Sequence, residues 1–147
     1  DKLKGLFKKD LKGLWRPNGL IEDYRGEPGI YRLIALDRSG NSKALRRVRG
    51  EKLDDKGVLY IGKSTNLFDR LKDLCLTICH SEDKHSAGTH YNEYRFKAVV
   101  PKCKIKVYVR KFDRETIDEK EYTEIRRYIR HFKELPPLNH SLPRGKG

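Results

Sequence analysis

Three short stretches with the hydrophobic pattern of strands constrain the fold of this chain more than any other feature. Residues 30–36 and 58–62 are apolar runs of strand length, and residues 104–110 alternate strictly between polar and apolar side chains. Such runs, bounded by glycine, proline and aspartate, predict β-strands. Apolar stripes at helical spacing follow over residues 66–78 and 116–135. The order predicts an α/β (α+β) fold with a small, mainly antiparallel three-stranded sheet flanked by helices.

The chain has 147 residues, which fits a single domain. Residues 1–28 form a basic lead-in, in which apolar residues recur at helical spacing between lysines up to Leu14, predicting an amphipathic helix. The main domain covers residues 29–140, and residues 141–147 form a polar, flexible tail. Because the chain starts at Asp1 and contains no Met, we expect a fragment or a processed form.

The charge balance indicates an anionic partner. Lys and Arg number 34 against 21 Asp and Glu, which gives a formal net charge of +13. An excess of this size is typical of proteins that bind nucleic acid. No apolar run approaches the roughly 18 residues of a membrane span, and no signal peptide is evident, so we expect no membrane partner. Three cysteines without a disulfide pattern indicate reduced thiols and a cytoplasmic location.

A long basic arm connects the first two predicted strands. Tyr31 and Tyr60 are separated by 28 residues, far more than a tight hairpin needs. The arm is rich in cations that suit phosphate contacts, and we predict that it binds DNA. These DNA-binding candidates are Lys43, Arg46, Arg47, Arg49 and Lys52.

The first two predicted strands carry a pair of related tripeptides. They are Gly29-Ile30-Tyr31 and Tyr60-Ile61-Gly62, with Arg70 on the helix that follows and Pro136-Pro137-Leu138-Asn139 after the last helix. Together these four features resemble the GIY-YIG nuclease superfamily over residues 29–139. The resemblance implies a metal-dependent DNA endonuclease that hydrolyses phosphodiester bonds.

Phosphodiester hydrolysis needs a base for the attacking water and cations for the charge that develops on the phosphate. Tyr60 is the candidate base, assisted by Tyr31, although a tyrosine pKa of roughly 10 must be lowered for that role. The ammonium of Lys63 would favour the phenolate. Arg70 matches the family's transition-state arginine, and its planar fork of donors suits a phosphate. Asn139 resembles the family's closing asparagine, which bonds near the active site.

The metal ligand has two candidates on the last predicted helix. At 3.6 residues per turn Glu121 falls within the apolar face of that helix and Glu124 at its edge. A carboxylate aimed into a core is explained by a hard cation, so Glu121 is favoured as the ligand of Mg²⁺ or Mn²⁺ and Glu124 is the alternative. The spacing from either residue to Asn139 is longer than in the family, which is a departure from its pattern.

A histidine near the attacking water occurs in some branches of the family. Leu74 stands four residues after Arg70, where one such histidine would be expected. Gly88-Thr89-His90 resembles another family position, so His90 is the first candidate and His85 the second. Both lie in a polar segment, residues 80–94, that we predict to be a loop.

The long basic arm resembles that of the restriction-enzyme members of the family, which implies restriction-type cleavage of duplex DNA. A homodimer on DNA would supply the two cuts that a duplex needs. The alternatives are a repair, recombination or mobile-element nuclease domain, and a catalytically silent module that binds nucleic acid. A zinc-stabilised binding protein is a third class, although the spacing fits no standard zinc pattern. Its ligands would come from Cys75, Cys79, His80, His85, His90 and Cys103.

Overall fold

The computed structural model describes residues 2–3, 7–9, 15–17, 19–47, 52–80, 83–94, 100–101 and 104–140. Its sheet has three long strands, which confirms the predicted mixed α and β architecture: β4 (Gly29–Ala35), β7 (Val58–Ser64) and β8 (Ile105–Lys111). The short β1 (Lys2–Leu3) adds to the outer edge of β8, so the strand order is β1-β8-β4-β7. All pairings are antiparallel, and β4 is the central long strand.

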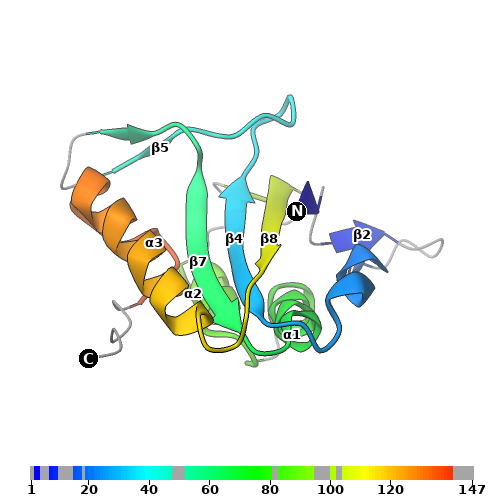
Figure 1. Cartoon of the computed structure of the whole chain (residues 1–147). Coiled ribbons are helices and arrows are strands. Elements are labelled where there is room, and N and C mark those ends of the chain that lie inside the picture. The colour runs from blue at the N-terminus through cyan, green and yellow to red at the C-terminus, as the bar shows by residue number, and fades with distance from the viewer. Residues whose placement is uncertain are drawn as a thin grey trace.

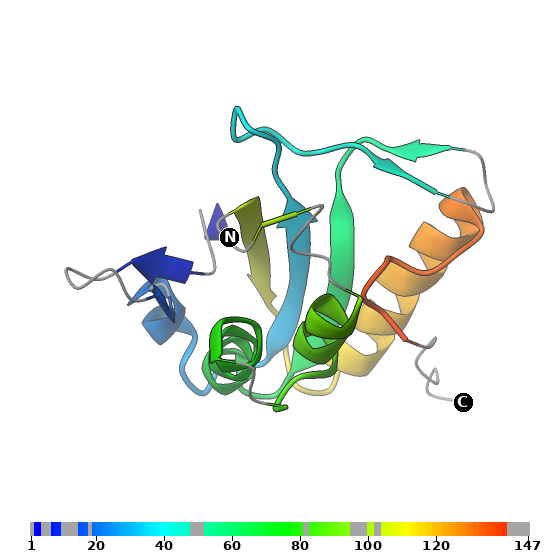
Figure 2. The same ribbon diagram turned by 180° about the vertical axis from the view of Figure 1, so that it is seen from behind.

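Helices cover the two faces of this sheet unequally. The helices α1 (Leu67–His80) and α2 (Ser86–Glu93) lie on one face, seen in front of the strands in Figure 2. The helix α3 (Ile117–Phe132) lies on the opposite face beside β7, as Figure 1 shows. The alternation of side chains along β4 supplies both cores. Leu33 packs with the α1 and α2 side, whereas Ile30 and Ile34 pack with α3.

The predicted N-terminal helix is wrong. The described residues of this region form β1, β2 (Phe7–Lys9) and β3 (Trp15–Pro17), followed by the 3₁₀ helix η1 (Gly19–Tyr24). The strands β2 and β3 pair with each other, and β1 pairs with β8. Two glycines in the first 13 residues cost a helix about 1 kcal/mol each relative to alanine. The open edge of β8 offers backbone hydrogen bonds instead.

The segment predicted as a loop also differs, because it contains the helix α2. His85 caps this helix: its Nδ1 accepts a hydrogen bond from the Ala87 N–H at 3.1 Å. Ala87 and Tyr91 are buried in the core shared with α1. The stability of this helix therefore depends on tertiary packing, which its polar composition does not predict. The predicted tail at 141–147 lies outside the described residues.

The long arm is present, but it folds back onto α3. It carries the small ribbon β5 (Leu45–Arg46) and β6 (Leu53–Asp54), which reaches the C-terminal end of α3 in Figure 1. The buried Asp54 accepts a hydrogen bond from the Tyr128 hydroxyl at 2.8 Å. Arg47 donates to the Leu135 carbonyl at 2.7 Å and forms an ion pair with Glu134 at 3.2 Å. These contacts attach the arm to the body of the domain.

Candidate active site

The two motif tyrosines meet on the face of the sheet that α1 and α2 cover. Tyr31 lies opposite Gly62 in the register of β4 and β7, and Tyr60 lies opposite Leu33. Their ring centroids are 5.9 Å apart. A Cβ at position 62 would lie 2.5 Å from a Tyr60 ring carbon and 2.7 Å from the Tyr31 hydroxyl oxygen. Only glycine leaves room for the two rings, which gives a physical reason for the tripeptide.

His85 joins the two tyrosines from the start of α2. The Tyr31 hydroxyl lies 2.6 Å from His85 Nε2, and the His85 and Tyr60 ring centroids are 5.5 Å apart. Because Nδ1 accepts the Ala87 N–H, the neutral ring carries its proton on Nε2. His85 therefore donates to the Tyr31 oxygen, and the hydroxyl proton of Tyr31 points away from His85. This hydrogen-bond direction follows from the helix cap.

The position of His90 is different from the expected one. Its Nδ1 lies 3.2 Å from the Leu138 carbonyl oxygen, and its ring stacks on Tyr94 at 5.3 Å between centroids. The His140 ring lies 5.2 Å away. Among the histidines of the described segments it is the second candidate, His85, that contacts the tyrosine pair, so the geometry favours His85 over His90.

Arg70 supplies positive charge at this cluster. It lies one turn into α1, which begins soon after β7 ends, and its Nη1 donates to the Lys84 carbonyl at 3.3 Å. Its charge acts on the pKa values of three neighbours, lowering those of Tyr31, Tyr60 and His85. Arg70 is therefore close enough to the two tyrosines to act on both hydroxyls.

Burial and the positive charge of Arg70 act in opposite directions on the pKa values of the two tyrosines. Burial raises the pKa of Tyr31 well above its usual value, and Arg70 opposes the rise. Burial also raises the pKa of Tyr60, which Arg70 lowers and the Glu121 carboxylate raises. Hydrogen bonds from Tyr31 and Ser86 lower the pKa of Tyr60 further. The net direction for Tyr60 is upward, so its phenolate needs additional positive charge.

Lys63, Asp118 and Glu121 form a charged group at the junction of β7 and α3. The Lys63 ammonium lies 2.5 Å from the Asp118 carboxylate and 3.8 Å from that of Glu121. Glu121 is buried, as its place on the apolar face predicted. Burial raises the pKa of Glu121, Lys63 lowers it, and Asp118 raises it. Sequence reasoning missed Asp118, although its spacing of three residues from Glu121 places both on one helix face.

Glu124 belongs to a separate environment. Its carboxylate lies 3.4 Å from the Arg32 guanidinium, on the face of the sheet that α3 covers. The Glu121 carboxylate, by contrast, is close enough to act on the pKa of Tyr60. The arrangement favours Glu121 as the ligand of a cation near the tyrosines.

Asn139 anchors the C-terminal segment to the edge of β7. Its side-chain oxygen accepts from the Ile61 N–H at 3.0 Å, and its side-chain nitrogen donates to the Ile61 carbonyl at 2.9 Å. The Leu138 N–H also donates to the Leu59 carbonyl at 2.9 Å. Asn139 and the backbone of Leu138 together hold β7 on either side of Tyr60, which is a positioning role.

The cations of the arm do not share one role. Arg47 is bound to the segment that follows α3, whereas Arg46 and Lys52 are exposed and Lys43 is half-buried. Arg49 lies outside the described residues. Over the described part of the chain, no group of three or more His, Cys, Asp and Glu residues is placed to hold a metal, and Cys103 is not among the described residues. Glu121 with Asp118 is thus a two-carboxylate arrangement.

The comparisons with known proteins place no further constraint on this site. No family model matches the chain, and neither the curated proteins nor the solved structures give a significant match. Among the helices of the described segments, none has the length and apolar character to cross a membrane.

His85 makes the stability of the domain depend on pH. Burial, aided by Arg70, lowers the pKa of His85 from 6.5 to about 3. The unfolded chain binds the extra proton between these values, so the free energy of unfolding falls as the pH drops below about 6.5. The slope from one proton is up to about 1.4 kcal/mol per pH unit. Urea unfolding between pH 7 and 4 should show a shallower dependence for His85→Gln.

The exposed His131 offers a matched control. His131→Gln should follow the wild-type pH dependence. If His85→Gln does so too, the buried neutral state assigned to His85 is wrong.

Proposed function

We propose that this protein is a metal-dependent DNA endonuclease that hydrolyses phosphodiester bonds, related to the GIY-YIG nucleases. The observation that carries the proposal is the convergence on Tyr60 of residues from four elements. Tyr31 on β4, His85 before α2, Arg70 on α1 and Glu121 on α3 all contact Tyr60 or act on its pKa. Packing alone does not require two hydroxyls, an arginine and a buried carboxylate at one point.

Tyr60 is the base in this proposal. The Tyr31 and Ser86 hydroxyls act to lower the pKa of Tyr60, and because His85 donates to the Tyr31 oxygen, the Tyr31 hydroxyl proton points away from His85. As a phenolate, Tyr60 takes a proton from water while the water oxygen bonds to phosphorus and the bond to the leaving oxygen breaks. Arg70 donates to the phosphate oxygens as negative charge builds on them. Lys63 adds positive charge near the same phosphate.

Glu121 fits a divalent cation such as Mg²⁺ or Mn²⁺. Its carboxylate is buried, and the cation nearest to it among the described side chains, Lys63, lies beyond hydrogen-bond distance. Hard cations commonly bind through one or two carboxylates and complete their shell with water and phosphate oxygens. Glu121, with Asp118 beside it, would hold the ion. When bound, the ion supplies charge neutralisation at the phosphate and the leaving oxygen.

Duplex DNA is the proposed substrate, with restriction-type cleavage preferred over a repair, recombination or mobile-element role. The support is the docked arm, which presents Arg46 and Lys52 to solvent. Two cuts across a duplex are consistent with a homodimer on DNA. A cytoplasmic location is proposed with this function.

The direct test is incubation of the purified protein with supercoiled plasmid in Mg²⁺ or Mn²⁺. We expect nicked or linear product from wild type and a loss of about 10²-fold or more in Arg70→Ala, because a charge-stabilising donor is removed. Lys72→Ala, an exposed cation two residues along the same helix, is the control and should cut normally.

Agarose electrophoresis with and without EDTA measures these rates. Intact plasmid under all metal conditions, with DNA binding retained, would instead indicate the catalytically silent module. Equal cutting by Arg70→Ala would contradict the mechanism while leaving the activity itself in place.

A further inference from the structure

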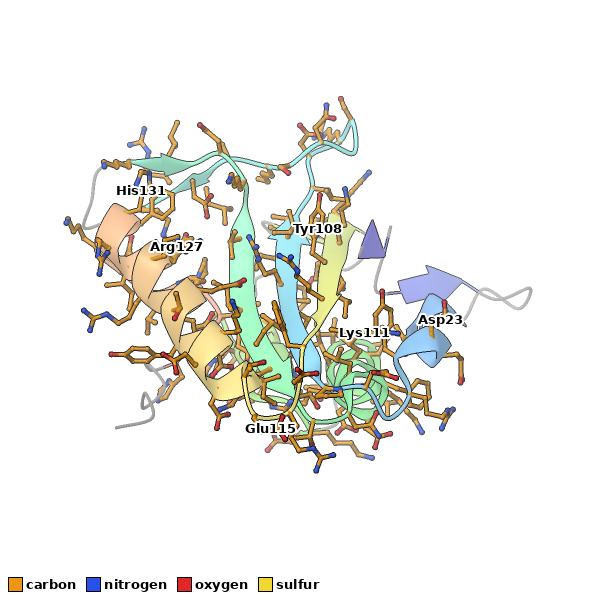
Figure 3. The ribbon with its side chains drawn as sticks, in the orientation of Figure 1. Asp23, Tyr108, Lys111, Glu115, Arg127 and His131 are labelled. Atoms are coloured by element: carbon orange, nitrogen blue, oxygen red, sulfur yellow. The ribbon has the colours of Figure 1, made fainter. Side chains whose placement is uncertain are left out.

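The half of the sheet that α3 leaves uncovered carries a second cluster of cations. In Figure 1 α3 lies beside β7, while the strands β4 and β8 face the viewer. Figure 3 shows side chains projecting from this face, with Tyr108 labelled on β8. The residues that share the face define what we term the platform. They are Arg32 from β4 and Lys106, Tyr108 and Arg110 from β8.

The sheet register sets the geometry of the platform. Arg32 lies directly opposite Tyr108, and the cations Lys106 and Arg110 stand two residues to either side of Tyr108. Residues two apart on one strand are separated by about 6.6–6.8 Å and point to the same face. Tyr108 is 38% exposed, and the Lys106 ammonium lies 5.2 Å from its ring centroid. A solvated aromatic ring is therefore flanked by positive charge along the strand.

A cavity of about 400 Å³ adjoins the platform. Apolar side chains from β4 and β7 form part of its wall, and Lys56 and Arg110 contribute cations. Glu124 lines it too. Its buried Oε2 forms an ion pair with the Arg32 Nε at 3.4 Å but accepts no hydrogen bond from the described residues. A buried acceptor in that state favours a ligand that brings an N–H donor.

We propose that this face binds a single-stranded nucleic acid, independently of the nuclease function. A base stacks on Tyr108, and the phosphates on either side lie against Lys106 and Arg110. A base with an exocyclic amino group enters the cavity and donates to Glu124, a pairing that carboxylates make with cytosine.

The chemistry of the lining favours this occupant. The platform and cavity together carry four cations, Arg32, Lys56, Lys106 and Arg110, against the single carboxylate of Glu124, so the ligand is an anion. Stacking on a sheet tyrosine requires an unpaired base, because the bases of a duplex already stack on one another. An acidic peptide would satisfy the cations but would leave the ring and the buried acceptor unused.

The test is fluorescence anisotropy of labelled oligodeoxycytidine and oligodeoxythymidine in EDTA, where hydrolysis cannot interfere. We expect Tyr108→Leu and Arg110→Gln each to weaken oligodeoxycytidine binding about tenfold or more. Lys111→Gln is the matched control, since Lys111 is the next residue on β8 and its ammonium lies 5.4 Å from the Tyr24 ring on the opposite face. Glu124→Gln should reduce the preference for oligodeoxycytidine over oligodeoxythymidine.

Three results would overturn the proposal. They are unchanged binding in both platform variants, an equal loss in Lys111→Gln, and displacement by polyglutamate as effective as displacement by oligodeoxycytidine. Thermal unfolding establishes that the variants are folded. Plasmid cleavage by Arg110→Gln should stay at the wild-type rate, so a failure at this face and a failure at the tyrosine site give different results.

Discussion

Tyr60→Phe is expected to reduce plasmid cleavage by at least about 10²-fold, the usual contribution of a positioned general base. The ring that packs against Tyr31 and His85 is retained, so the sheet should keep its shape. Only the oxygen that accepts the proton of water is lost. The single-turnover cleavage rate measures this step, and DNA binding in EDTA should be unchanged.

Two other tyrosines sharpen the test. Tyr122 lies on α3, where its hydroxyl accepts a hydrogen bond from Arg126, and Tyr122→Phe should cut at the wild-type rate. Tyr31→Phe removes the acceptor of a buried His85 N–H, so it should lose stability as well as activity. A Tyr60→Phe protein that cuts as fast as wild type would exclude Tyr60 as the base.

Glu121→Gln is expected to abolish metal-dependent cleavage, with a loss of about 10²-fold or more, because a divalent ion contributes several kcal/mol at the reacting phosphate. The amide is nearly isosteric but lacks the charge that holds a cation. Because burial raises the pKa of Glu121, the substitution should not destabilise the fold at neutral pH. Cleavage across a Mg²⁺ and Mn²⁺ titration measures the effect.

Glu124→Gln is the matched partner, three residues along the same helix. Its carboxylate lies beside Arg32 rather than near Tyr60, so this variant should retain cleavage at all metal concentrations. Loss of cutting in Glu124→Gln with normal cutting in Glu121→Gln would reverse the assignment of the metal ligand.

The hydrophobic pattern along the chain was sufficient to predict the strands and helices that bury one regular face. The strand runs at β4, β7 and β8 and the stripes of α1 and α3 follow periods of 2 and 3.6 residues, and the structure has each element close to its predicted bounds. The burial of Glu121 was predicted from the same helical period, because its apolar neighbours at helical spacing place it on the buried face of α3.

Where the hydrophobic pattern predicted the wrong secondary structure, contacts between distant parts of the chain determined it. The N-terminal segment has helical periodicity, yet its described residues form strands: β1 pairs with the open edge of β8, and β2 and β3 pair with each other. The segment around His85 is polar, yet it forms α2 because α1 supplies a core for Ala87 and Tyr91. Neither the free edge nor that core is visible in local sequence.

Some features of the candidate site were likewise predictable from the sequence, and others depend on the tertiary structure. The sequence by itself predicted that the two tyrosines lie on two neighbouring strands and that Arg70 follows on a helix. The tertiary structure decided which histidine and which glutamate join them. His85 reaches Tyr31 because it caps α2, and Glu121 approaches Tyr60 because α3 packs beside β7. Contacts between residues 54 or more positions apart depend on how helices pack on a sheet, which no spacing along the chain encodes.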